Sequence, residues 1–111
     1  MAKKGLLIKE EDIKDLISNM GFSIASNTII YEGEKIGYMY RENPDSNEDS
    51  GWRFLSGNES QEYVDDEENS KIMAVNTMAN YDPAIIPYLK MPVGSEMERV
   101  EGKDEFREVQ E

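Results

Sequence analysis

Residues 49–59 read DSGWRFLSGNE and hold the only tryptophan of the chain, set between two glycines that suit turns. Trp52–Leu55 reads as a short strand, in which successive side chains point to opposite faces of a sheet. Trp52 and Phe54 would share one face and pack into the core, while Arg53 takes the other face. Tryptophan and arginine are also favoured as interface anchors. The composition favours the core for Trp52 and leaves an interface role open.

Helical signals lie on both sides of this strand. A helix is predicted over about Glu10–Met20, with three acidic residues in its first turn. Apolar residues recur there at helical spacing: Ile13, Leu16, Ile17 and Met20. A short helix is predicted over residues 82–90, with Asp82 as its cap and a proline at its first position. Another short helix could begin at Asn58, with Gln61 completing a capping box.

Segments with strand-forming composition lie before and after Trp52–Leu55 in the sequence. Thr28–Glu32 and Lys35–Tyr40 are rich in β-branched and aromatic residues, and a two-residue turn between them predicts a hairpin. Lys71–Asn76 and Ser95–Val100 are further strand candidates. Residues 42–51 have the composition of an exposed loop. These elements predict an α+β domain with an antiparallel sheet, an N-terminal helix and one or two short helices packed on it.

The length of 111 residues allows one domain at most. We expect residues 1–22 to be an N-terminal helical segment and residues 23–101 to be the α+β core domain. Residues 102–111 are rich in charge and are expected to form a frayed C-terminal tail.

The charge of the chain points to the chemistry of its partners. The net charge is −12, and residues 41–70 carry ten acidic against two basic groups. Such a chain is repelled by nucleic acid and by anionic membranes, so a basic protein or a cation is the natural charged partner. No apolar run approaches the roughly 20 residues of a membrane span, and no secretory signal is evident. A cytoplasmic protein is therefore expected.

Catalytic and metal signatures are weak. The chain has no histidine and no cysteine, which removes the commonest general base, thiol chemistry and zinc sites built from those ligands. Asp45, Asn47 and Asp49 sit at three positions of a calcium loop, but the required glycine and bidentate glutamate are replaced by Ser50 and Ser56. A small hydrolase using two carboxylates stays as the least favoured alternative, and no cofactor is predicted.

Several segments together resemble a known family. DSGWRFLSGNE (49–59) is followed by NTMANYDPAIIPYL (76–89) and then by PVGSEMER (92–99). In their order and spacing, over about residues 23–99, these segments are similar to a bacterial domain family filed as being of unknown function. That family is also classed as immunity protein family thirty-three of the polymorphic toxin systems. Asn58 stands where the family usually has an acidic residue.

The resemblance implies a small protein that neutralises a toxin by binding it without catalysis. An acidic surface would suit a basic toxin, which its field would steer into contact. Glu59, Glu62, Asp65 and Asp66 are the expected steering carboxylates. The expected short-range anchors, where exposed, are Trp52, Arg53, Tyr63 and Tyr81. An uncharacterised housekeeping interaction domain, kept soluble by its charge, is the alternative.

Overall fold

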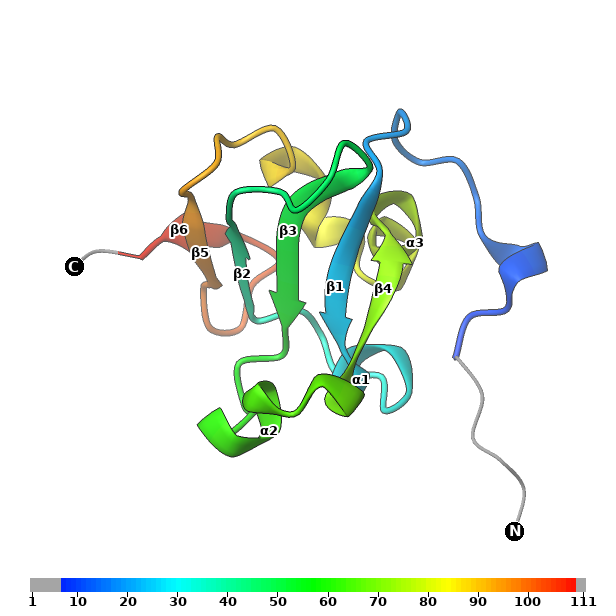
Figure 1. Ribbon diagram of the computed structural model, residues 1–111. Helices are drawn as coiled ribbons and strands as arrows, with labels where there is room; N and C mark the ends of the chain where they lie inside the picture. Colours follow the sequence, from blue (N-terminus) through cyan, green and yellow to red (C-terminus); the bar gives the residue numbers. More distant parts are fainter. Residues whose placement is uncertain (1–6, 110–111) are drawn as a thin grey trace, which may run out of the picture.

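The strand predicted at Trp52–Leu55 is confirmed, but it begins earlier, within the segment expected to be a loop, and forms β3 (Asp49–Leu55) near the middle of the sheet. In the computed structural model, which describes residues 7–109, it belongs to a six-stranded sheet with the order β4-β1-β3-β2-β5-β6 (Figure 1). The other strands are β1 (Phe22–Ser26), β2 (Tyr38–Arg41), β4 (Ser70–Ala74), β5 (Glu96–Arg99) and β6 (Phe106–Glu108). The helices are η1 (Glu10–Asp12), α1 (Asn27–Ile30), α2 (Gln61–Asp65), η2 (Glu67–Asn69), α3 (Val75–Tyr81) and η3 (Pro83–Tyr88), where η marks a 3₁₀ helix.

The sheet is mixed, so the prediction of a purely antiparallel sheet is wrong. β1 pairs with β3 in parallel, while the other neighbouring strands pair in an antiparallel sense. The predicted hairpin from residue 28 does not form, because Asn27–Ile30 is a helix capped by the hydroxyl of Ser26. Ile29 and Ile30 are almost fully buried. A short apolar run fits a buried helix as well as a strand, and tertiary packing decides between them.

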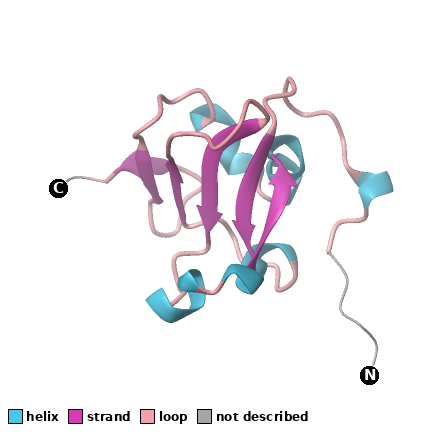
Figure 2. Cartoon of the chain, viewed as in Figure 1, coloured by secondary structure: helices cyan, strands magenta, loops and turns pink. Residues whose placement is uncertain are grey.

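One face of the sheet carries the hydrophobic core. α1, α3 and η3 lie behind the sheet in Figure 2 and cover this face. Asp82 caps η3 by accepting a hydrogen bond from the Ala84 amide, which confirms the predicted cap. The predicted strand over Lys71–Asn76 is correct only for its first part, because α3 begins at Val75. The core side chains come from every layer and include Trp52, Phe54, Met39, Val75, Met78, Ile85 and Met97.

The predicted N-terminal helix is wrong. Only the 3₁₀ turn Glu10–Asp12 forms, and the chain that follows is held by asparagine side chains of α3. Asn76 Oδ1 accepts from the amides of Leu16 (2.8 Å) and Ile17 (3.2 Å), while Asn80 Oδ1 accepts from Lys14 (3.0 Å). These contacts replace the hydrogen bonds of a helix. The first six residues of the predicted segment lie outside the described residues.

The predicted frayed tail contains an ordered strand. β6 pairs with β5, and Phe106 is buried against the edge of the Tyr88 ring at a centroid distance of 5.4 Å. The Phe106 amide also donates to the Tyr88 hydroxyl (3.0 Å). A single aromatic residue in a charged segment is enough to anchor it. Residues 110–111 lie outside the described part of the chain.

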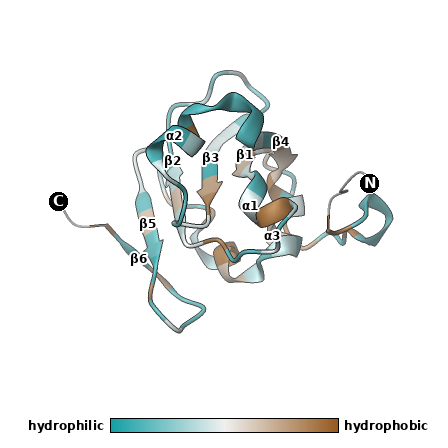
Figure 3. Cartoon of the chain, turned by 90° about the horizontal axis from the view of Figure 1, so that it is seen from below, coloured by the Kyte–Doolittle hydropathy of each residue, from teal (hydrophilic) through white to brown (hydrophobic). Residues whose placement is uncertain are grey.

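The second face of the sheet is covered only in part, by the α2–η2 segment. Viewed from below in Figure 3, α2 and α3 lie on opposite sides of the strands, and α2 is hydrophilic. α2 begins after Ser60, which accepts from the Tyr63 amide, and not at the predicted cap Asn58. We call this second side of the sheet the open face. Among residues 7–109, no helix has the length and apolar character needed to cross a bilayer.

Candidate functional site

The open face carries a continuous row of side chains across five strands. The strand register pairs Ile72 with Ile24, Ile24 with Arg53, Arg53 with Tyr40, and Tyr40 with Glu96. Paired residues in a sheet project from the same face. The row therefore changes from apolar at the β4 edge, through a central arginine, to aromatic and acidic at β5.

A second row lies beside the first on the acidic half. Leu55 pairs with Tyr38, Tyr38 with Glu98, and Glu98 with Arg107. The Tyr38 hydroxyl donates to Glu96 Oε2 at 2.6 Å, and this bond links the two rows. Burial, together with this hydrogen bond, raises the pKa of Tyr38 well above its ordinary value. Tyr38 therefore stays protonated and keeps Glu96 in one orientation.

Arg53 is the fixed centre of the open face. Only 4% of its surface is exposed, and its guanidinium donates to Asp49 (2.8 and 2.9 Å) and to Glu42 (2.6 Å). The hydrogen bonds from Arg53 hold the pKa of Asp49 far below its usual range, against the opposing effect of burial. One buried cation thus faces two carboxylates, and the cluster keeps a net negative charge.

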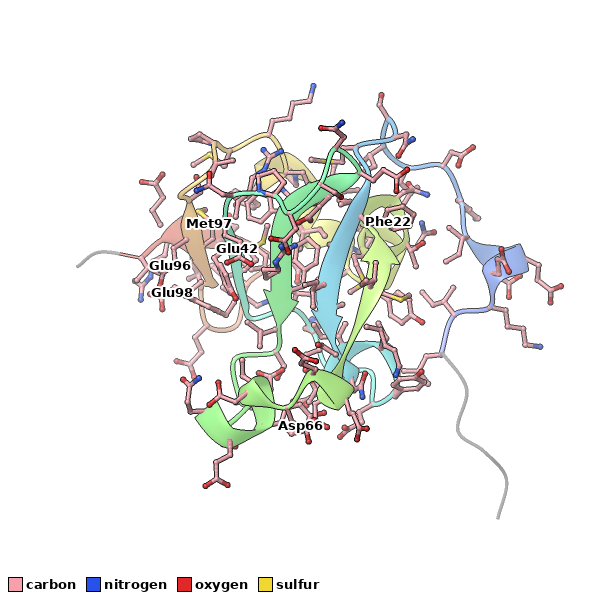
Figure 4. All side chains as sticks on the ribbon, in the orientation of Figure 1. Phe22, Glu42, Asp66, Glu96, Met97 and Glu98 are labelled. Carbon is pink, nitrogen blue, oxygen red and sulfur yellow. The ribbon has the colours of Figure 1, made fainter. Side chains whose placement is uncertain are left out.

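The apolar half of the face has an acidic rim. Phe22 is 44% exposed and Ile72 is 74% exposed, and both lie next to Ile24. A hollow of about 300 Å³ joins these residues to Asp45 and Glu48 of the loop before β3. In Figure 4, Phe22 lies on the β1 side of the face, whereas Glu42, Glu96 and Glu98 gather on the β2–β5 side.

α2 borders the lower edge of the open face. A depression of about 200 Å³ lies between the sheet and the α2 region, and Tyr40, Arg53, Tyr63 and Val64 contribute to its lining. Burial, together with the negative charge of nearby Glu32, raises the pKa of Tyr63. Tyr63 and Arg53, two of the predicted anchors, are therefore brought together in one depression.

Two other predicted anchors lie elsewhere. Trp52 has no exposed surface, stacks on Phe54 at 6.1 Å, and donates from its indole nitrogen to the Leu89 carbonyl (3.0 Å). It is a core residue and presents no surface to a partner in this structure. Tyr81 belongs to α3 behind the sheet, where its hydroxyl accepts from the Ile8 amide (3.2 Å).

The predicted steering carboxylates divide into two groups. Glu62, Asp65 and Asp66 are exposed in or next to α2, as a steering role requires. Glu59 instead accepts hydrogen bonds from the amides of Ser56 and Gly57 (2.9 Å each) and from the Thr28 hydroxyl (2.7 Å). Glu59 is therefore part of the structure that joins α1 to the turn after β3.

We expect Glu59→Gln to lower the free energy of unfolding by about 2 kcal/mol, the usual worth of a hydrogen bond to a charged group. Burial opposes ionisation, but the hydrogen bonds from Ser56 and Thr28 prevail and lower the pKa of Glu59 to about 2. Because this pKa is depressed, the stabilisation is complete above the ordinary value near 4.5 and disappears as the pH falls through about 2.

Urea unfolding of the wild type and of Glu59→Gln between pH 7 and pH 2 measures this effect. The exposed Glu62→Gln is the matched control and should change stability by less than about 0.5 kcal/mol. A difference between wild type and Glu59→Gln that did not shrink toward pH 2 would contradict the role of the ionised carboxylate.

The sequence reasoning missed the acidic and aromatic side chains of the open face. Tyr38 and Tyr40 occur two residues apart in YMYR, and Glu96 and Glu98 do so in EMER. This spacing places each pair on one face of its strand. The signal was present, but only the topology shows that β2 and β5 are neighbours and that helices cover the other face.

The segment that partly matches a calcium loop is engaged in contacts within the protein. Among residues 7–109, no group of three or more His, Cys, Asp or Glu residues is placed to hold a metal ion. In the segment that partly matches a calcium loop, Asp49 accepts hydrogen bonds from Arg53 and from the amides of Asp45 and Gly51. The described carboxyls with displaced pKa values, Asp49 and Glu59, both have lowered values.

Comparison with known proteins gives a family match that covers nearly the whole folded domain. A family model described as the Immunity protein Imm33 domain matches residues 23–110, from β1 to beyond β6. No significant match is found among curated proteins or among solved structures. The family match spans most of the chain and includes the open face, and the protein belongs to the Imm33 immunity protein family.

Proposed function

We propose that this protein neutralises a toxin by stoichiometric, non-catalytic binding, and that an acidic surface around residues 42–68 guides the toxin into contact. The match to an immunity protein family over residues 23–110 carries the proposal, because membership of such a family implies a toxin partner. A small domain that binds its target needs a rigid surface of suitable chemistry and no reaction centre.

The distribution of charge supports a basic toxin. Residues 41–70 hold ten acidic groups, of which Asp49 and Glu59 serve internal hydrogen bonds and Glu42 pairs with Arg53. The seven other carboxylates are exposed on the loop before β3 and on the α2–η2 segment: Asp45, Glu48, Glu62, Asp65, Asp66, Glu67 and Glu68. Exposed like charges of this kind accelerate association with an oppositely charged partner more than they tighten the complex.

The direct test uses the product of the neighbouring gene, which we expect to be a toxin. Co-expression with this protein should restore growth, and the purified pair should form a complex of fixed stoichiometry without covalent change to the toxin. If the protein bound an unrelated housekeeping protein and did not protect cells from the toxin, the alternative of a general interaction domain would be favoured.

Charge reversal on α2 is expected to slow association about tenfold at low salt. The variant combines Glu62→Lys, Asp65→Lys and Asp66→Asn, and Glu59 is left intact because its carboxylate is structural. Asparagine at residue 66 retains an oxygen for the amide of Glu68. Stopped-flow association with the toxin at several salt concentrations should show a slower rate and a weaker dependence on salt.

A matched control makes the same charge change at η1. Glu10→Lys, Glu11→Lys and Asp12→Asn alter three exposed residues of the N-terminal turn. This control should change the association rate less than the α2 variant does. Equal rates for the two variants would mean that net charge alone acts and that α2 is no steering surface.

A further inference from the structure

We infer that the open face of the sheet is the surface that anchors the partner. The partner would present to it an apolar side chain flanked by arginine or lysine. This inference rests on the proposed function and adds the place and chemistry of the contact. The exposed carboxylates of α2 would then act at long range, while the two rows of the sheet make the close contacts.

The apolar half of the open face supplies the first part of the contact. Ile72 is 74% exposed and Phe22 is 44% exposed, although both belong to strands of the central sheet. Together with Ile24 they line a hollow whose rim carries Asp45 and Glu48. Apolar surface ringed by charge is the usual anatomy of a protein contact, in which the centre is desolvated and the rim stays wet.

The acidic half supplies the second part. A hollow of about 330 Å³ is lined by Tyr38, Tyr40, Glu42 and Glu96, among others. Arg41 also lines it, but its guanidinium donates to the carbonyls of Ser50 and Met91. The two tyrosine rings lie 5.8 Å apart and tilted by 44°, so each offers an aromatic face or edge to the hollow. A guanidinium or ammonium group placed there would meet aromatic rings and carboxylates together, a combination that binds cations.

In the described part of the chain, the carboxylates of the acidic half outnumber the cations of the protein that pair with them. Arg53 is almost fully buried and already paired with both Glu42 and Asp49, so one cation is shared by two carboxylates. Arg107 pairs with Glu98 at 2.9 Å. Among the ion pairs of residues 7–109, none includes Glu96. A cationic side chain of a partner would complete the arrangement.

Several side chains of the open face are held in place by hydrogen bonds to neighbouring side chains. Tyr38, Glu96 and Arg53 are held by side-chain hydrogen bonds on strands of the sheet, so binding orders them little. α2 has only five residues, and its carboxylates at Glu62 and Asp65 are exposed. Aromatic groups with fixed orientation make better anchors than mobile surface carboxylates, because they lose less conformational entropy on binding.

The register sets the spacing that a partner must match. Ile72 and Glu96 stand at the two ends of one row, separated by four strand spacings. At about 4.8 Å for each spacing, the apolar and cationic groups of the partner should lie roughly 15–20 Å apart. A surface of this extent is within the size of ordinary specific interfaces.

The first test measures the affinity of the full chain for the toxin that the growth-protection experiment identifies. Ile72→Asp should raise the dissociation constant tenfold or more, since a charge replaces an exposed apolar anchor. Leu16→Asp makes the same exchange at a residue that is 42% exposed on the N-terminal segment and should change affinity less than twofold. Equal effects of the two variants, or none, would overturn the inference while leaving toxin binding established.

The second test does not depend on the toxin. A nitrogen-15 NMR titration with L-argininamide should produce its largest amide shifts at Tyr38, Tyr40 and Glu96. Glu96→Gln should reduce these shifts at least twofold, whereas Glu11→Gln, which removes one exposed charge elsewhere, should not. Largest shifts on α2, or shifts unaffected by Glu96→Gln, would overturn the acidic half of the contact even if the toxin binds.

Discussion

Asp82→Ala is expected to lower the free energy of unfolding by about 3–5 kcal/mol, the typical cost of breaking one side of a buried ion pair. Asp82 is 7% exposed, forms a short ion pair with Arg99, and accepts from the amides of Ile36 (3.0 Å) and Ala84 (3.2 Å). Alanine would leave the guanidinium, which also lies over the Phe106 ring, without its buried partner.

Chemical unfolding of a small set of variants measures this effect. Asp104→Ala is the matched control, because Asp104 pairs with the same arginine at 3.0 Å but its side chain is 76% exposed. The control should cost less than about 1 kcal/mol, as exposed pairs usually do. The double variant Asp82→Ala with Arg99→Met should recover part of the loss, because no uncompensated charge remains. Similar losses for Asp82→Ala and Asp104→Ala would contradict a buried pair.

This ion pair links segments that carry the family resemblance. Asp82 belongs to NTMANYDPAIIPYL and Arg99 to PVGSEMER, so the pair joins two of the three segments. The Trp52 indole donates to the Leu89 carbonyl and joins the third. The three segments therefore contribute contacts that hold the domain together, and two of them, DSGWRFLSGNE and PVGSEMER, also supply Arg53 and Glu96 to the open face.

The local chemistry of single segments predicted part of the fold. The strand at Trp52, its inward aromatic face, the cap at Asp82 and the strand Glu96–Arg99 all follow from alternation or from turn residues. These features depend on neighbours in sequence, so a single sequence contains them. The parallel pairing of β1 with β3 depends on how the chain crosses the sheet, which no local pattern specifies.

The N-terminal segment shows how tertiary contacts override a periodic pattern. Ile17 and Met20 pack against the core as the apolar spacing suggests, but they do so from an extended chain. Asn76 and Asn80 bind the backbone of this chain through side-chain hydrogen bonds. Such a competitor for backbone groups lies some 60 residues away in sequence, so helical spacing alone could not reveal it.

The candidate site was predicted less well than the fold. Composition identified the acidic region and Arg53, and the structure places Arg53 and Tyr63 in one depression. Composition did not separate the structural carboxylate of Glu59 from the exposed carboxylates of α2, because the distinction depends on contacts with Thr28 and Ser56. Exposure decides which aromatic residues can reach a partner, and exposure follows from packing.

Trp52→Ala should cost about 3–5 kcal/mol of unfolding free energy, the usual range for removing a buried large aromatic side chain. Trp52 has no exposed surface, and its ring contacts Phe54 and lies 5.7 Å from the Arg41 guanidinium. Trp52→Phe keeps most of the apolar volume but loses the hydrogen bond to Leu89, so it should cost about 1–2 kcal/mol.

The same two variants separate a core residue from an interface residue. For a core residue, Trp52→Phe should leave the affinity of the folded protein for the toxin within about twofold of wild type, because no atom of Trp52 reaches the open face. For an interface anchor, affinity would fall tenfold or more while stability changed little. Calorimetric binding, at a temperature where the variant is fully folded, measures the first quantity, and urea unfolding measures the second. A loss of affinity without a loss of stability would show that Trp52 moves outward on binding and that the core position is only its unbound state.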